Sequence, residues 1–431
     1  MAGLTLTLNT AGQTLQNTQT EIQTSSNNIS NASSTGYSRQ TAVQTDNPAI
    51  LTASGWLGTG ANVSQITQAR DRFLEQKLMD ATTQDSQYTS LSSELTTIQA
   101  VCTDSGSNGI SLTLGNFFNS WSTLAQDTTN LSNQTGVYSA AQSLASALKS
   151  TYNQLNQIAV SDVPGQIQDT VGQANKLIDQ IAELNTAIAK NETPNFQANT
   201  LRDQRYQAMD DLAKLIPVSF SQDSSTGAFT VNTTDASGQL TVVSGGTATH
   251  IAADSTITGG QLGGLLTAQT DLSGYTSQLN DFASTLISEV NSIAKSNGGS
   301  DVFSGTDASS ITASTTFLNG LTSSQLSTLS QSMADLQDSQ VTFSSGSQTT
   351  LEEFLSNIQQ TVGDDVQTAN DNQKFYDSLK SELQTQQQSV SGVSVDEELV
   401  NIIKFQQIYE AAAKVVQTTA TLMSTAINMV K

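Results

Sequence analysis

Few residues in this chain could take part in catalysis, and they stand alone. The 431 residues include a single histidine, His250, and a single cysteine, Cys102. Zinc sites built on paired histidines are therefore excluded, and a Ser-His or Cys-His dyad would have to use His250. We expect His250 to be a surface or strand residue. We expect Cys102, which cannot form an intrachain disulfide, to be a small buried hydrophobe.

Other patterns that could bind a ligand are incomplete. The segment DSGSNG, 104–109, resembles the opening of an EF-hand loop, but its third position is Gly106 and its twelfth is Gly115, where a glutamate is required. The glycines of GWLGTG and GGQLGG lack the dinucleotide-binding spacing, and no P-loop lysine follows them. Spacing alone leaves a carboxylate-pair glycosidase open, because 38 acidic residues bring carboxylates together by chance. We predict no catalytic residue, no cofactor, no metal site and no enzyme activity.

One predicted helix carries several charges close together. We expect them to form an ion-paired or solvated face without chemistry. They are Arg202, Asp203, Arg205, Asp210 and Asp211.

Composition narrows the class of protein further. The net charge of -22 argues against binding to nucleic acid or to anionic membrane surfaces, both of which would repel the chain. No apolar run approaches the length of a transmembrane helix. The start, MAGLTLTLNTAGQ, lacks the basic region and apolar core of a secretory signal peptide, which by itself indicates a cytoplasmic protein. With 36% hydrophobic and 5% aromatic residues, thin and elongated domains are expected rather than one thick core.

The last stretch, 394–431, is the strongest structural signal. Ten of its positions, mostly apolar, follow one another at alternating spacings of four and three, the seam of a coiled-coil helix. Ser394 and Glu397 form a predicted capping box at its start. The seam consists of Leu399, Ile402, Gln406, Tyr409, Ala413, Val416, Ala420, Met423, Ile427 and Val430.

The first 32 residues repeat this spacing, with two polar interruptions, Thr18 and Ser25. Only Glu21 is charged among residues 1–38, and the remaining Thr, Gln, Asn and Ser are mediocre helix formers. We expect the two terminal helices to pack on each other and neighbouring subunits to complete them. The predicted assembly interface is Leu4, Leu8, Ala11, Leu15, Ile22 and Ile29 on the first helix, and Leu399, Ile402, Tyr409, Ala413, Val416, Ala420, Met423, Ile427 and Val430 on the last.

The middle of the chain is predicted to be mainly helical, with one β insertion. Helices are expected over 68–101, 137–159, 167–188 and 349–389, with Pro164 and Gly165 breaking the second from the third. Asn185 falls on an apolar seam and is expected to be paired. From residue 218 the period changes to two, which predicts a small antiparallel meander. Residues 297–347 are expected to mix helix and turn, and Phe117, Phe118 and Trp121 to anchor a core.

The predicted fold class is therefore mainly α, with paired N- and C-terminal helices forming a coiled coil, an elongated helical middle domain and a small antiparallel β insertion. The predicted domains are 1–35 with 394–431, the terminal coiled coil; 36–216 with 265–393, the helical domain; and 217–264, a small outer β domain.

Two terminal motifs resemble a known family. NNISNASSTGYSRQ, 27–40, is similar to the N-terminal motif of the bacterial flagellar axial proteins, which include the rod, hook and hook-associated proteins. GVSVDEELVNIIKFQQIYEAAAKVVQT, 392–418, looks like the matching end of the members at the hook-filament junction. The resemblance implies a structural subunit that joins hook to filament, assembled as a ring through its terminal helices.

The same resemblance implies a location and partners. Axial proteins leave the cell unfolded through the flagellar type III apparatus with an uncleaved signal, so the expected location is the extracellular flagellum rather than the cytoplasm. Implied partners are further copies of the chain, hook protein, the second junction protein and an export chaperone. Two alternatives stay open: another axial subunit such as hook protein, and an adhesin or enzyme displayed on a helical stalk. The acidic triplet at 396–398 favours the junction subunit.

Overall fold

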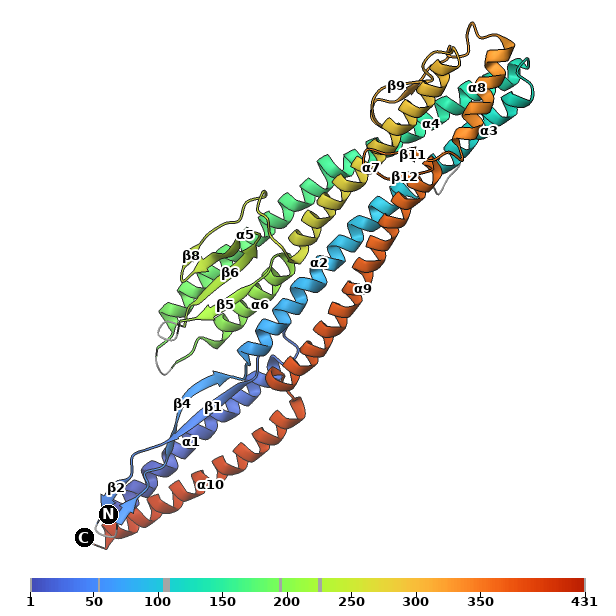
Figure 1. Cartoon of the computed structure of the whole chain (residues 1–431). Coiled ribbons are helices and arrows are strands. Elements are labelled where there is room, and N and C mark those ends of the chain that lie inside the picture. The colour runs from blue at the N-terminus through green and yellow to red at the C-terminus, as the bar shows by residue number, and fades with distance from the viewer. Residues whose placement is uncertain (1, 53–54, 104–108, 194–195, 224–226, 430–431) are drawn as a thin grey trace. The chain divides into compact units, whose positions relative to one another are not determined.

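Helices account for most of the chain, in the computed structural model that describes residues 2–52, 55–103, 109–193, 196–223 and 227–429. The predicted mainly α fold is confirmed (Figure 1). Contacts divide the chain into two units. Unit 1 contains residues 1–83, 172–257 and 376–431, and unit 2 contains 84–171 and 258–375.

Unit 1 brings the two ends of the chain together. Its terminal elements are α1 (Ala2–Ser30), β1 (Gln40–Asp46), β2 (Ile50–Thr52), β3 (Gly55–Leu57), β4 (Ala61–Gln68) and α10 (Val395–Asn428). α1 lies side by side with α10 and also contacts β1 and β4, which pair antiparallel (Figure 1). The predicted pairing of the terminal helices is therefore confirmed.

The predicted meander forms the four-stranded sheet of unit 1. β5 (Ser219–Gln222), β6 (Phe229–Asp235), β7 (Gly238–Ser244) and β8 (Thr247–Ala248) follow one another in an antiparallel sheet of that order. Alternate residues of β6 are buried, as a period of two requires. Phe229 stacks on Phe220 of β5 with ring centroids 4.9 Å apart, and Tyr206 of α6 (Asn199–Leu215) meets both rings edge-on. These aromatic contacts fix the sheet on α6.

Unit 2 is helical and has an aromatic core. It contains parts of α2 (Arg72–Cys102) and α9 (Leu351–Ser391), together with α3 (Ile110–Gln126), α4 (Leu131–Gln157), α7 (Gly260–Ser296) and α8 (Ser323–Leu336). Two short hairpins, β9 (Phe303–Ser304) with β10 (Thr312–Ala313) and β11 (Val341–Thr342) with β12 (Gln348–Thr349), complete the predicted mixed region. The predicted anchors Phe117, Phe118 and Trp121 are at most 2% exposed.

The helix break predicted at Pro164 and Gly165 is wrong. α4 runs through a single π turn, Ile158–Asp162, directly into α5 (Val163–Asn191). The Val163 N–H donates to the carbonyl of Ile158, five residues back, so the turn is wider than an α turn. Proline lacks an N–H and its ring crowds the preceding turn, and a widened turn relieves that conflict at the start of α5.

Candidate functional site

The predicted interface residues of α1 are all buried or half-buried. Its two polar interruptions are more deeply buried than most of its apolar residues, since Thr18 is 1% and Ser25 is 5% exposed. The Thr18 hydroxyl donates a 2.7 Å hydrogen bond to the carbonyl oxygen of Thr14, so its burial leaves no donor unpaired. Ala11 is buried, and the others are half-buried: Leu4, Leu8, Leu15, Ile22 and Ile29.

The face of α10 that packs on α1 is turned by about one residue from the predicted seam. Its buried residues are Glu398, Ala412 and Thr419, each directly before a predicted seam position. Small and polar side chains let the helices approach closely here, where leucine or isoleucine would hold them apart. The predicted residues divide into half-buried Ile402, Ala413, Val416 and Met423 and exposed Leu399, Tyr409, Ala420 and Ile427, while Val430 lies outside the described residues.

The exposed members of that seam keep much of their surface open after α10 has packed on α1. Leu399 is 47%, Tyr409 41% and Ile427 47% exposed, so these side chains remain open on the paired helix. Their role in contacts between copies of the chain stays a prediction.

A buried hydrogen-bond network around Asn28 joins the two terminal helices, α1 and α10. Its amide nitrogen donates to the Glu398 carboxylate (2.8 Å) and to the Gln40 carbonyl (2.9 Å). Its amide oxygen accepts from the Gln40 N–H (2.9 Å) and the Tyr37 hydroxyl (2.8 Å). Burial, with the nearby Asp203 and Glu398 carboxylates, raises the pKa of Tyr37 to about 12, so the phenol keeps its proton. One side chain thus joins α1, the segment after it, and α10.

The residues of this network are absent from the predicted interface. The sequence signal that could have revealed this network was the polar helix end of the motif at 27–40. Asn28 lies in that motif and is 1% exposed. The start of α10 is held by further contacts to the same motif. The Arg39 N–H donates to the Ser391 carbonyl (2.8 Å), and its guanidinium lies 3.8 Å from Glu397. Of the predicted capping box, the Ser394 half is confirmed, since the Ser394 hydroxyl accepts from the Glu397 N–H at 3.4 Å.

A second buried cluster surrounds Arg70. Its guanidinium binds Glu75 at 2.8 Å and Asp203 at 2.9 Å, and it donates to the Gly36 carbonyl at 2.7 Å. It also lies 4.3 Å from the ring centre of Tyr206. Burial raises the pKa of both acids, against the opposing effect of the one cation that they share. Ser38, Gln68 and Gln387 donate further hydrogen bonds to these carboxylates.

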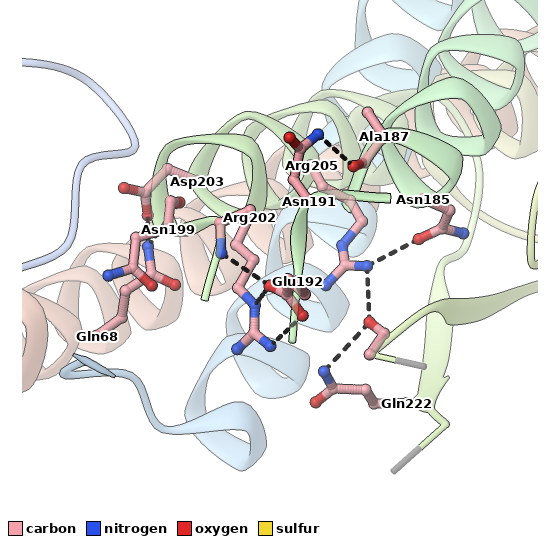
Figure 2. Close-up of polar contacts among 12 residues, drawn as sticks. Gln68, Asn185, Ala187, Asn191, Glu192, Asn199, Arg202, Asp203, Arg205 and Gln222 are labelled. Carbon is pink, nitrogen blue, oxygen red and sulfur yellow. Dashed lines mark hydrogen bonds and ion pairs between the residues drawn. The ribbon is translucent and has the colours of Figure 1, made fainter. Parts of the chain in front are cut away.

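Asn185 is paired, as its place on an apolar seam predicts. Its amide nitrogen donates to the Phe229 and Gly245 carbonyls, both at 2.8 Å. Its oxygen accepts from Arg205 (2.8 Å) and from the Phe229 N–H (3.1 Å). Arg205 also donates to the Gly227 carbonyl at 3.0 Å and lies 3.5 Å from the Phe229 ring centre. Figure 2 shows the hydrogen bond from Arg205 to Asn185.

The charged face predicted on α6 is divided between two environments. Arg202 forms a two-pronged ion pair with Glu192, whose pKa is lowered by these bonds and the Ala198 N–H although burial opposes ionisation (Figure 2). Lys214 pairs with Asp211 at 2.7 Å near the surface. The expectation of a solvated or ion-paired face is wrong for Arg205, which is fully buried, and burial lowers its pKa to about 10.

The residues considered for catalysis belong to different units. His250 is exposed and contacts Asp179 at 2.8 Å, and Cys102 is buried. Residues 104–108 of the EF-hand-like segment lie outside the described residues. Among the described residues, no group of three or more His, Cys, Asp and Glu side chains is placed to hold a metal ion. The same part of the chain contains no helix long and apolar enough to cross a membrane.

Two regions of the chain match models of flagellar protein families. Residues 95–256 match the flagellar hook-associated protein FlgK helical domain. Residues 385–429 match the C-terminal region of the flagellar basal body rod FlgEFG proteins. The first match covers much of the helical middle and the β insertion, and the second covers the end of α9 and all of α10.

Individual relatives agree with these matches. Flagellar hook-associated protein 1 of Salmonella typhimurium is 32% identical over 253 residues, which are 57% of this chain and 44% of the relative. The protein of the same name from Bacillus subtilis is 27% identical over 230 residues, or 51% and 45% of the two chains. The match thus spans less than half the length of these relatives. The resemblance to the axial proteins predicted from the terminal motifs is confirmed.

A solved structure is also similar in part. The flagellar hook junction protein FlgK from Burkholderia pseudomallei is 26% identical, with a TM-score of 0.42 over 53% of this chain and 46% of that one.

Proposed function

We propose that this chain, as a relative of the flagellar hook-associated proteins, is a structural subunit that joins the flagellar hook to the filament. Copies of it assemble as a ring through α1 and α10. The two helices together form the element that meets neighbouring subunits, and the remaining helices and the β5–β8 sheet lie outside that contact. The chain carries no catalytic role in this proposal.

The observation that carries the proposal is the apolar surface left on α10 after it has paired with α1. Leu399, Ile403 and Leu422 are 47%, 55% and 52% exposed. A monomer gains nothing from such exposure, and apolar surface of this kind marks protein interaction sites. The exposed side of α1 is uncharged and polar, so a neighbouring copy can approach the helix pair without burying unpaired charge.

Partners and location follow from the same proposal. The chain contacts further copies of itself, hook protein on one side and the second junction protein on the other. An export chaperone holds the C-terminal region before export, and the chain leaves the cell without loss of a signal peptide to act on the extracellular flagellum. Nucleic acid and membrane are not partners, because the net charge of -22 opposes contact with either polyanion.

One observation favours a second candidate, another axial subunit such as hook protein. The match over 385–429 is to a region described for the basal body rod proteins rather than for hook-associated proteins. The match over 95–256 is to the FlgK helical domain and supports the junction subunit instead.

A deletion experiment separates the candidates. A strain that lacks the gene should build hooks of normal length, carry no filaments and release flagellin into the medium. Expression of the intact chain should restore filaments, and immunogold label should bind at the end of the hook. A deletion strain without hooks would support the second candidate, and a strain with normal filaments would contradict both.

A further inference from the structure

Large exposed apolar side chains gather on a short hairpin near the N-terminus. Strands β2 and β3 pair antiparallel, with Leu51 opposite Trp56 and Ile50 opposite Leu57. Their exposed fractions are 68% and 73% for the first pair and 45% and 46% for the second. We call these four residues the hairpin patch. An isolated hairpin is marginally stable in water, and one with this surface requires a partner.

A second exposed apolar surface runs along α10. Ile408, Val415 and Leu422 of α10 and Met429, directly after its last residue, follow one another at intervals of seven residues, so they lie in one row. All four are exposed, because α1 covers the adjoining row that contains Ala412 and Thr419. We call these four residues the helix row.

Charge makes the segments that bear these two surfaces the favourable place for two copies to meet. Residues 1–71 and 395–431 contain seven acidic and five basic side chains, so they carry only -2 of the net charge of -22. Elsewhere two copies bring a large excess of like charge together, which opposes association. A second copy is therefore repelled least where it approaches these terminal segments.

The polarity of the remaining surface decides which parts meet. The exposed row of α1 contains Asn9, Gln16 and Gln23, which cannot cover an apolar row on a neighbouring α10. The hairpin patch offers the matching chemistry, since its aromatic and aliphatic side chains would bury both surfaces together. Continuous apolar contact of this kind is the principal source of association free energy.

We propose that the hairpin patch of one copy packs on the helix row of a second copy. The proposal rests on the proposed function, in which copies assemble through their terminal segments. Because two different surfaces meet, the contact is heterologous. Repetition of a heterologous contact gives a closed ring or a helical array, whereas a contact between identical patches would stop at a dimer.

Site-specific cross-linking in flagella tests this contact. In a Cys102→Ser background, one copy carries Trp56→Cys and a differently tagged copy carries Leu422→Cys. The two are expressed together in cells whose own gene is deleted. Flagella are isolated and treated with a short bismaleimide. We expect a cross-linked dimer that contains both tags, and a ladder of higher species when one chain carries both cysteines.

The matched control replaces Trp56→Cys with Phe196→Cys, because Phe196 is 71% exposed but lies outside both surfaces. This control should lose the mixed dimer. Equal cross-linking from positions 196 and 56, cross-linking of 422 mainly to itself, or cross-linking of 56 to hook protein would each overturn the proposed contact while the chain remains at the junction. Absence of the wild-type chain from flagella would instead overturn the proposed function, and the contact with it.

Discussion

The side-chain amide of Asn28 donates a 2.8 Å hydrogen bond to the carboxylate of Glu398, 370 positions further along the chain, and both side chains are buried. This contact joins the C-terminal end of α1 to the first turn of α10. It allows an acidic residue to lie inside the terminal unit, because the carboxylate receives a donor there in place of water. The relation between the two helices is therefore set by polar matching as well as by apolar contact.

Removal of this acceptor should loosen the terminal helices. Glu398→Ala leaves one Asn28 N–H without its partner in a buried place, and we expect a loss of about 1–3 kcal/mol in the free energy of unfolding of the α1–α10 pair. Glu397→Ala is the control, because its side chain is 70% exposed and its contact with Arg39 spans 3.8 Å. Amide hydrogen exchange of α1 and α10 measures the difference. Equal protection in both variants would contradict the role of Asn28.

The bonds of Asn185 predict a large effect on the β sheet. Asn185→Ala removes partners from Arg205 and from the backbone of Phe229 and Gly245 at once. We expect a loss of about 3 kcal/mol or more, because buried polar groups lose their partners together. Asn191→Ala is the control in the same helix, since its side chain is exposed and donates a 2.8 Å hydrogen bond to the Ala187 carbonyl (Figure 2). Urea unfolding should rank the two variants in this order.

Asp210 should make stability depend on pH. Burial, with the nearby Glu75 carboxylate, raises the pKa of Asp210 to about 7 against the opposing charges of Arg70 and Lys214. The unfolded chain ionises this carboxyl near its ordinary value of about 4, so unfolding becomes easier as the pH rises from about 4 to about 7. The contribution of the neutral Asp210 carboxyl to the free energy of unfolding is complete below pH about 4 and lost above pH about 7.

Asp210→Asn should remove that dependence. At pH 8 we expect the variant to be more stable than the wild type by about 1–2 kcal/mol, a value reduced for partial exposure, and at pH 4 the two should be equal. Asp211→Asn is the control. It removes the same charge from the neighbouring position, where the Asp211 carboxylate pairs with Lys214 near the surface. Thermal unfolding between pH 4 and pH 8 gives the comparison. A stability difference that does not vary with pH would be inconsistent with a raised pKa.

Neighbouring alanines on α10 should respond differently to charge. Ala412 is buried against α1, so Ala412→Glu introduces an acid there and should cost several kcal/mol, enough to separate the helix pair. Ala413 is half-buried, and Ala413→Glu should disturb the monomer less while still blocking assembly. Hydrogen exchange of the monomer and the presence of filaments on cells measure the two effects. Loss of protection in both variants to the same extent would show that the faces are not distinct.

The sequence patterns predicted where the helices and strands lie along the chain better than which face of each helix is buried. The spacing of Leu and Ile located the start of α10 within one residue, but the face that α1 covers contains Glu398, Ala412 and Thr419. Alanine and threonine occur on both sides of the helix, so their identity does not reveal which side is covered. The burial of Glu398 within its acidic triplet is equally hard to predict from the sequence, because negative charge is favourable at a helix start whether or not it is buried.

Polar clusters were predictable only where a local pattern was violated. Asn185 interrupts an apolar seam, and that conflict alone predicts a partner. Arg70 and Asp203 meet across 133 positions, and nothing in either local sequence indicates the contact. Pro164 is the opposite case, because a strong local signal for a break was overcome by one widened turn.

The distance along the chain between Asn28 and Glu398 also bears on the order in which the molecule folds. Contacts between residues far apart form late, because a long loop must close before they contribute. α1 and its partner helix are separated by most of the chain, and α1 is too poor in strong helix formers to hold a stable helix alone. We therefore expect the middle of the chain to fold before α1 and α10 have paired. The joining of α1 and α10 is then the slow final step of refolding, with a rate that changes little when the β5–β8 sheet is stabilised.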